Sequence, residues 1–192
     1  MTDRRSAVLQ SALTTFARYG YRKTSMDAIA RSANISRPGL YFLFDSKEEL
    51  FRAAVESALE EDLTEVERIL GVPDRTIRDR VLDAFERWAG RYIGPMTWDL
   101  GSIIDDNPEL LGAMVVDAPE RFAALLVSAL ESAGPIVPAR TSTALAQTLI
   151  STSIGIKHQV QERQSYRERL ATAVDLLLPT GARHARSAPR AE

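Results

Sequence analysis

The stretch SANISRPGLYFLFDSKEEL, residues 32–50, places a proline and a glycine side by side between two helical patterns. Ser36 can cap a helix whose first turn contains Pro38, and proline is tolerated there because the N–H that it lacks would have no intrahelical partner. Ser46 can cap a second helix, with Glu49 at the spacing of a capping box. The stretch therefore predicts two helices, and the proline begins the first of them instead of breaking it.

Two further helices are expected before this stretch. Apolar residues recur at helical spacing over 4–19, which predicts an amphipathic helix, and Gly20 ends it. Thr24 or Ser25 can cap a short helix that ends near Ala33. Two short helices joined by a tight turn and braced by longer helices form a helix-turn-helix unit, whose second short helix enters the DNA major groove by its N-terminus. The sequence therefore predicts a DNA-binding head.

The second short helix begins with side chains that suit DNA. Arg37 can donate two hydrogen bonds to guanine, and the ring of Tyr41 can pack on thymine methyls or sugar. Gly39 would let a foreign backbone approach closely, and Lys47 can hold a phosphate at the start of the following helix. Alternatively, Arg37 is a solvated surface residue and the aromatic side chains are half-buried packing residues. The expected DNA-contacting residues are Lys23, Thr24, Ser25, Ser36, Arg37, Pro38, Gly39, Tyr41, Phe42 and Lys47.

At these residues the sequence resembles the TetR family of transcriptional regulators, over residues 12–51. The matching residues are Phe16, Gly20, Thr24, Ser25, Ile29, Ala30, Ser36, Pro38, Leu40, Tyr41, Phe44, Lys47, Glu48 and Leu50. Members of the family often carry a histidine at the position of Leu43, where it contacts phosphate. That contact is therefore expected to be missing here or to be made by another residue.

The remainder of the chain shows helical patterns and no strand-like alternation. The predicted helices of this part span 75–92, 108–133, 140–161 and 165–178. Asp74 is the expected cap of the first of them, and Pro119 is expected to kink the second. The predicted fold is all-α, with an N-terminal three-helix helix-turn-helix DNA-binding head joined to a helical-bundle ligand-binding and dimerisation domain.

The domain boundaries follow from these helices. We expect a helix-turn-helix DNA-binding domain at 1–46, a helical effector-binding and dimerisation domain at 47–180, and a mobile tail at 181–192. A helix from about 46 to 70 links the two domains. The tail lacks the periodic apolar residues that would hold it against a core.

A dimer is expected because a single head covers one half-site, whereas a two-fold pair of heads covers a palindromic operator in double-stranded DNA. In TetR relatives the last two helices form a four-helix dimer interface, and the resemblance implies the same interface here. The expected interface residues are Leu149, Thr152, Gly155, Ile156, Leu170, Val174 and Leu177. The alternative is that this apolar stripe belongs to the core of a single chain.

Bulky residues of the middle helices are candidates for a small-molecule pocket. A glycine and a proline interrupt the segment 92–106, and a pocket in a helical bundle needs an imperfectly packed helix. The resemblance implies that an effector binds there and shifts the fourth helix, which changes the separation of the two heads. The candidate pocket residues are Phe85, Trp88, Tyr92, Met96, Trp98, Met114 and Phe122. Each of them can instead be an ordinary core residue.

The charge distribution agrees with this division. Residues 1–50 contain eight Lys and Arg against five Asp and Glu, a net charge of +3, which leaves −5 for the rest of the chain. A basic end on an acidic body is expected when only that end meets a polyanion. The sequence shows no cysteine, no segment typical of a secretory signal and no apolar run long enough for a membrane span, so we expect a cytoplasmic protein without membrane contact.

Enzymatic chemistry has little support in the sequence. The two histidines, His158 and His184, are too few for a metal cluster or a catalytic triad, and no glycine motif that cradles phosphate is present. His158 is more simply a structural residue, although it could contact a ligand. Asp105 and Asp106 could bind a metal or a cationic ligand but are more simply a loop and a helix cap. We expect no enzyme activity, no catalytic residues, no metal and no cofactor.

These observations predict a sequence-specific DNA-binding transcriptional regulator, a repressor that a small-molecule effector releases from its operator. Two alternatives stay open. The first is a helical small-molecule-binding or enzymatic module that has kept the head as a scaffold. The second is a regulator that binds DNA without any ligand.

Overall fold

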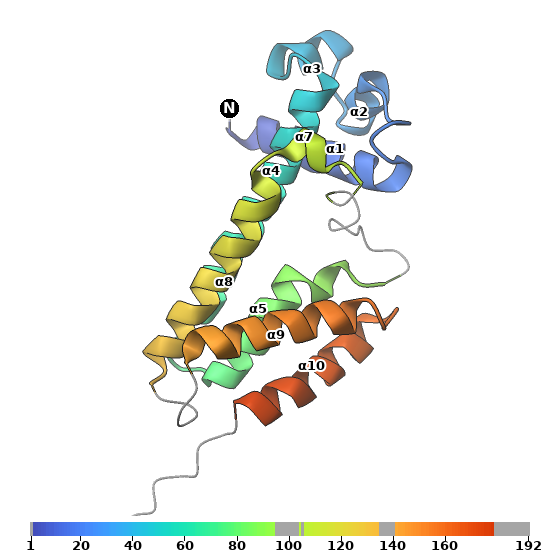
Figure 1. The fold of residues 1–192 in the computed structure, drawn as a ribbon. Coiled ribbons are helices and arrows are strands. Elements are labelled where there is room, and N and C mark those ends of the chain that lie inside the picture. Colours follow the sequence, from blue (N-terminus) through green and yellow to red (C-terminus); the bar gives the residue numbers. More distant parts are fainter. Residues whose placement is uncertain (1, 95–103, 105, 135–140, 179–192) are drawn as a thin grey trace, which may run out of the picture.

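The computed structural model describes residues 2–94, 104, 106–134 and 141–178, and over these ranges it contains helices and no strands. The N-terminal part consists of α1 (Thr2–Tyr19), α2 (Met26–Ser32), α3 (Arg37–Leu43) and α4 (Lys47–Leu70). The second part consists of α5 (Ile77–Trp88), the 3-10 helix η1 (Gly90–Tyr92), α7 (Pro108–Leu111), α8 (Met114–Ser132), α9 (Ser142–Lys157) and α10 (Arg163–Leu177). Figure 1 shows a head of α1, α2 and α3 at one end, a body with α5, α9 and α10 at the other, and α4 running with α8 between them.

Serine caps begin α3 and α4, as the sequence predicts. Ser36 Oγ accepts a hydrogen bond from the backbone N–H of Gly39 at 3.1 Å, and Ser46 Oγ accepts one from the backbone N–H of Glu49 at 3.0 Å. The carboxylate of Glu49 accepts a hydrogen bond from the backbone N–H of Asp45 at 2.7 Å, one residue before the position that a capping box uses. The two helix starts in this stretch are confirmed.

The cap of α2 is Ser25 and not Thr24. Ser25 Oγ accepts a hydrogen bond from the backbone N–H of Ala28 at 3.2 Å, whereas the buried Thr24 donates its hydroxyl to the carbonyl of Gly20 at 2.8 Å. Asn34 follows the helix with a φ of 53°, a left-handed conformation that asparagine tolerates. This residue makes the tight turn from α2 to α3.

Aromatic rings and an ion pair join α4 to both parts of the molecule. Phe16 of α1 and Phe51 of α4 are fully buried and meet edge to face, with ring centroids 5.1 Å apart. Further along α4, the carboxylate of Glu60 accepts two hydrogen bonds from Arg121 of α8, at 2.6 and 3.0 Å. The same helix therefore carries the head at its start and belongs to the body towards its end.

The core of the body is built around aromatic side chains. Phe85 of α5 and Phe122 of α8 meet with ring centroids 5.2 Å apart, and Trp88 stacks on Phe122 at 4.9 Å. Tyr166 of α10 is fully buried, and its hydroxyl shares a hydrogen bond of 2.7 Å with the hydroxyl of Ser153 of α9. These contacts hold α5, α8, α9 and α10 together.

Three predicted features of the body differ from the structure. Thr76, not Asp74, caps α5, because its hydroxyl accepts a hydrogen bond from the backbone N–H of Asp79 at 3.1 Å. The last turn predicted for this helix is instead the separate 3-10 helix η1. The predicted helix over 108–133 is divided at Gly112, whose φ of 58° suits glycine, whereas Pro119 lies inside α8 without ending it.

The predicted tail at 181–192 lies outside the described residues. Because α4 is shared by the head and the body, the division at residue 46 stays a prediction. None of the described helices is both long and apolar enough to cross a membrane.

Candidate nucleic-acid interface

The first turn of α3 is exposed at the end of the head (Figure 1). Ser36, Arg37 and Pro38 are exposed, and Pro38 occupies a position at which a helix leaves the backbone N–H unpaired. A Cβ added to Gly39 would lie 3.0 Å from Ser36 Oγ. The glycine therefore leaves room for the serine cap of its own helix. This local role is separate from the prediction that a foreign backbone approaches Gly39.

The guanidinium of Arg37 is held from two sides. Asp27 of α2 pairs with it, at 3.1 Å between Nε and Oδ1, and the guanidinium lies 5.6 Å from the centroid of the Tyr41 ring. Hydrogen bonding with Tyr41 and the charge of Asp27 raise the pKa of Arg37, so the side chain stays protonated. The Arg37 side chain is 61% exposed. Because a guanidinium has five N–H donors, donors remain for a base edge.

Two adjacent aromatic side chains extend this surface. Tyr41 is 39% exposed and Phe42 is 85% exposed, whereas the preceding Leu40 is fully buried in the head. The buried leucine fixes the rotation of α3, which directs the two rings outward. A phenylalanine with so little burial contributes almost nothing to packing within the chain, and its exposure suits contact with a partner.

Lys47 and Thr24, both expected at the DNA surface, have structural partners. Lys47 Nζ donates hydrogen bonds to the carbonyls of Tyr21 at 3.1 Å and Thr24 at 3.2 Å, and it lies 4.3 Å from the centroid of the Tyr21 ring. These bonds use two of the three N–H groups of the ammonium. Thr24 is 3% exposed, so its side chain cannot reach DNA. The two residues instead hold the loop between α1 and α2 against α4.

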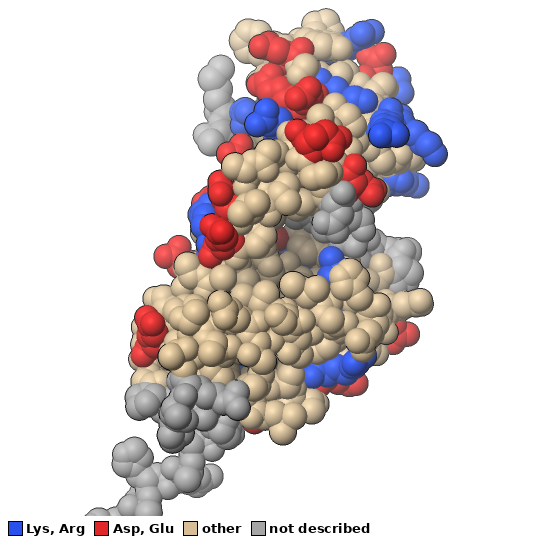
Figure 2. Space-filling model, viewed as in Figure 1, with Lys and Arg blue, Asp and Glu red and all other residues tan. Residues whose placement is uncertain are grey.

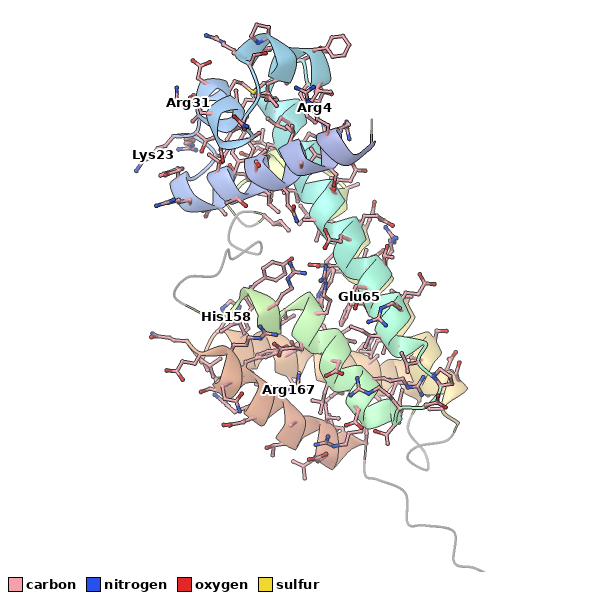
Figure 3. The ribbon with its side chains drawn as sticks, turned by 180° about the vertical axis from the view of Figure 1, so that it is seen from behind. Arg4, Lys23, Arg31, Glu65, His158 and Arg167 are labelled. Carbon is pink, nitrogen blue, oxygen red and sulfur yellow. The ribbon has the colours of Figure 1, made fainter. Side chains whose placement is uncertain are left out.

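Basic residues from two helices and the loop between them form a surface that no single motif indicated. Arg18, Lys23 and Arg31 line a shallow groove of about 490 Å³ between α1 and α2. Figure 3 labels Lys23 and Arg31 at this edge of the head and Arg4 on α1, and Figure 2 shows Lys and Arg gathered over the head. The net positive charge of the N-terminal residues was the available signal, but only the packing of α1 on α2 brings these side chains together.

The predicted small-molecule site corresponds in part to a cavity of about 400 Å³ in the body, bounded by α4, α5, η1, α8 and α9. The predicted pocket residues that line it are Trp88, Tyr92 and Met114. Phe85 and Phe122 are almost completely buried and belong to the core behind this wall, because they pack on each other. Met96 and Trp98 lie outside the described residues. His158 also lines the cavity, at the end of α9.

Asp62 is a site residue that sequence reasoning missed. It lies in α4 and is 2% exposed, and its Oδ1 lies 2.6 Å from Arg87 Nη2 and 2.9 Å from Arg91 Nη1. The hydroxyl of Tyr92 donates a hydrogen bond to Oδ2. Asp62 lines the cavity beside Tyr92. In the sequence it follows Glu60 and Glu61, and such a run of acidic residues is typical of a solvated helix face.

The predicted dimer residues divide into two groups. Those buried within the single chain are Leu149, Ile156, Leu170 and Val174. Those that are half-buried are Thr152, Gly155 and Leu177. The first four form core, because α9 and α10 turn their most apolar faces towards the bundle, so these side chains cannot form the surface that a second copy meets. On the outside of the same helices, Ile154 is 54% exposed and Leu176 is 78% exposed.

Comparison with known proteins identifies the head. The family model of bacterial regulatory proteins of the tetR family matches residues 8–54. IcaR of Staphylococcus epidermidis, the negative transcriptional regulator of the biofilm operon icaADBC, is 40% identical over 50 residues, which cover 26% of this chain and 27% of IcaR. The uncharacterized HTH-type transcriptional regulator YhgD of Bacillus subtilis is 37% identical over 59 residues, 31% of each protein. The chain thus matches less than a third of the length of these relatives.

Solved structures extend the similarity beyond the head. The reduced form of E. coli NemR superimposes with a TM-score of 0.74 at 19% identity, covering 94% of this chain and 99% of NemR. A TetR-family transcriptional regulator of Agrobacterium tumefaciens superimposes with a TM-score of 0.69 at 19% identity, covering 91% of this chain and 97% of the other. At this identity the superpositions show a common fold. The head, residues 8–54, thus matches the tetR family of bacterial regulatory proteins, and the whole chain shares the fold of these regulators.

Proposed function

We propose that the protein is a homodimeric, sequence-specific DNA-binding transcriptional regulator. The observation that carries the proposal is the exposed first turn of α3, where Arg37 is held between Asp27 and Tyr41 with Phe42 beside them. A helix that enters the major groove by its N-terminus presents such side chains to base edges, and arginine matches guanine. The basic groove between α1 and α2 supplies contacts to phosphate.

A second copy would complete the DNA-binding unit, because one α3 covers one half-site and a two-fold pair covers a palindromic operator. The helix α9 carries no charged side chain before Lys157, and its face is almost free of charge in Figure 2. Ile154 and Leu176 expose large apolar side chains on α9 and α10. An uncharged surface with exposed apolar side chains is typical of a dimer interface, which supports these two helices as its location.

The regulator is proposed to be a repressor that a small molecule releases from its operator. IcaR, which is similar in the head, is a negative transcriptional regulator. The body cavity has Leu59 and Asp62 of α4 in its wall, and α4 carries the head. A ligand that shifts α4 would change the separation of the two heads and weaken simultaneous binding to both half-sites.

The two alternatives lead to different expectations for this cavity. A regulator that binds DNA without a ligand has no compound that both fills the cavity and weakens DNA binding. A binding or enzymatic module with a scaffold head would bind a compound and would not select any DNA sequence. The regulators among the relatives favour the proposed function over a module with a scaffold head.

Selection of duplexes from a random-sequence pool, followed by fluorescence anisotropy at two salt concentrations, tests the proposal. The wild-type protein should enrich a palindromic sequence and bind it tightly and with strong salt dependence. Arg37→Ala should lose most of the preference for that sequence. Arg68→Ala removes an equal charge from the far end of α4, where Arg68 pairs with Glu65, and it should bind as the wild type does. Failure of the wild-type protein to enrich any sequence would contradict the proposed function.

A further inference from the structure

The wall of the body cavity indicates the class of molecule that it takes. We propose that the ligand is an uncharged aromatic molecule that carries a hydroxyl group, a phenol, and that this hydroxyl donates a hydrogen bond to the carboxylate of Asp62. The inference rests on the proposed role of the cavity as the effector site.

Most of the cavity wall is apolar. Its apolar lining includes Leu59, Trp88, Ile104, Met114, Val115 and Ala118. Phe122 stacks on Trp88 with 8° between the ring planes, which holds the indole as a rigid, flat part of the wall. Flat aromatic ligands gain from stacking or edge contact with such a ring. The volume of about 400 Å³ lies within the usual range for small-molecule pockets, so a ligand of one or two fused rings fits.

The polar lining of the cavity consists of Asp62, Tyr92, Ser153, Lys157 and His158, and among them Asp62 supplies a buried carboxylate. Its Oδ1 is occupied by Arg87 and Arg91, whereas its Oδ2 accepts the hydroxyl of Tyr92. A ligand hydroxyl that reaches Oδ2 therefore competes with the Tyr92 hydroxyl for this acceptor. Burial and the neighbouring Asp62 raise the pKa of Tyr92 far above its usual value, so Tyr92 remains a donor. The cavity thus presents a carboxylate oxygen, and a ligand matches it with a hydrogen-bond donor.

The charges around the cavity favour an uncharged donor. Asp62 and Glu61 provide two carboxylates, and Glu61 pairs with Arg87 at 3.0 Å. The guanidiniums of Arg87 and Arg91, which pair with Asp62, balance these two carboxylates. A cationic amine or a carboxylate would therefore add an unbalanced charge beside this group, and a carboxylate would also be repelled by Asp62. A neutral hydroxyl donates without either cost.

Asp62 also connects the cavity to the head. With Arg91 and Tyr92 it lines a second cavity, of about 510 Å³, whose other walls include Leu9 and Leu13 of α1. Asp62 is thus the point at which η1 is bonded to the helix that carries the head. A ligand hydroxyl that replaces the Tyr92 hydroxyl at Oδ2 breaks one of the bonds that join η1 to α4 and leaves the Arg91 pair, which loosens this connection and gives a route from ligand binding to a movement of the head.

Isothermal titration calorimetry of the intact chain without DNA tests the ligand class with three matched probes: 2-naphthol, 2-methoxynaphthalene and 2-naphthoate. The three share one ring system and differ in the group that meets Asp62. We expect 2-naphthol to bind about tenfold more tightly than 2-methoxynaphthalene, which has no donor, and 2-naphthoate to bind most weakly. Equal binding of 2-naphthol and 2-methoxynaphthalene, tightest binding of 2-naphthoate, or no binding of any probe would overturn the proposal.

Two variants locate the contact at Asp62. Tyr92→Phe removes the competing hydroxyl and keeps the aromatic wall, so 2-naphthol should bind roughly three- to tenfold more tightly, a gain that a damaged fold cannot produce. Asp62→Asn replaces the carboxylate with a weaker acceptor and should reduce the preference for 2-naphthol over 2-methoxynaphthalene at least about threefold. Glu56→Gln, at an exposed position of α4 away from this cavity, is the matched control and should change neither affinity. Weaker binding of 2-naphthol to Tyr92→Phe, or an unchanged preference in Asp62→Asn, would also overturn the proposal.

The DNA-binding assay separates this inference from the proposed function. If the naphthalene series behaves as expected but no DNA sequence is selected, the ligand class stands and the regulator function fails. If DNA is selected but the probes show no preference for the hydroxyl, the regulator function stands and the ligand class is wrong.

Discussion

Among single residues, the orientation of Arg37 depends on its neighbour Asp27. The two side chains come from the two short helices of the helix-turn-helix unit and meet at 3.1 Å. Exposed ion pairs contribute little to the free energy of unfolding. The effect of this pair is therefore on the direction of the guanidinium, which is what a bidentate contact with guanine requires.

We expect Asp27→Asn to reduce sequence preference without weakening DNA binding in general. The substitution removes the partner that orients Arg37. The difference in binding free energy between operator and random DNA should therefore fall by about 0.5–1 kcal/mol, which lowers the ratio of the two affinities. It also removes a negative charge near the phosphates, so affinity for random DNA should rise slightly. Competition binding with both duplexes measures the ratio. Asp45→Asn removes the same charge from another exposed position of the head, and an equal fall in the ratio there would contradict the orienting role of Asp27.

Phe42 should matter for DNA binding and not for folding. Because its side chain is 85% exposed, Phe42→Ala should change the free energy of unfolding by less than about 0.5 kcal/mol. If the ring is buried against sugar or thymine in the complex, operator binding should weaken by about 1.5 kcal/mol. Urea unfolding and anisotropy provide the two measurements. Val116→Ala, at an exposed apolar residue of the body outside the proposed dimer surface, is the control for non-specific effects on solubility, and unchanged DNA affinity in Phe42→Ala would place the ring outside the interface.

At the scale of elements, α3 is a helix of seven residues whose order depends on its surroundings. Isolated helices of this length do not form in water, because nucleation costs more than so few hydrogen bonds return. Two features compensate for its length. Ser36 caps its exposed start, and Leu40 anchors its middle in the core of the head.

Ser36→Ala is expected to lower the free energy of unfolding by about 1 kcal/mol through loss of the cap. The same change should weaken operator binding further, because the frayed turn is the one that presents Arg37. Thr141→Ala removes an equivalent cap from α9, where Thr141 Oγ1 accepts a hydrogen bond from the backbone N–H of Ala144 at 3.1 Å. The two variants should therefore be similarly destabilised in thermal unfolding but differ in DNA affinity. Equal DNA affinities would show that the cap of α3 serves stability alone.

At the scale of the whole molecule, the arrangement places the head and the proposed dimer surface at opposite ends of α4 (Figure 1). The head contributes the DNA contacts, and the outer surfaces of α9 and α10 lie in the body. A movement of α4 relative to the body therefore changes the distance between two heads in a dimer, even when neither head changes internally.

Leu176→Arg should weaken the dimer. Its side chain is 78% exposed on α10, and a charge at an apolar interface would raise the dimer dissociation constant at least about tenfold. Val116, which is 57% exposed on α8, provides the matched control Val116→Arg. Sedimentation equilibrium of the two variants gives the comparison. A dimer that withstands Leu176→Arg and dissociates in Val116→Arg would move the interface to α8.

The sequence by itself determined the head and the helical class of the body, because their signals are local. Ser36 and Ser46 each act on a backbone N–H three residues away, and Pro38 acts within its own turn. The residues that make such interactions lie within a few positions of one another, so a sequence pattern can identify them without knowledge of which distant segments pack on the helix. For this reason the helix-turn-helix unit could be predicted almost to the residue.

Only the tertiary structure decided which side chains are buried, because burial depends on segments that are far apart in the chain. The partners of Lys47 are 26 and 23 residues away, and they turn an expected phosphate contact into a structural one. The apolar stripe with Leu149 and Leu170 suits a core as well as a dimer interface, and packing of α9 and α10 on the bundle made it core. Asp62 looks like a surface residue in the sequence, yet the approach of α5 and η1 to α4 encloses it and creates the polar point of the cavity.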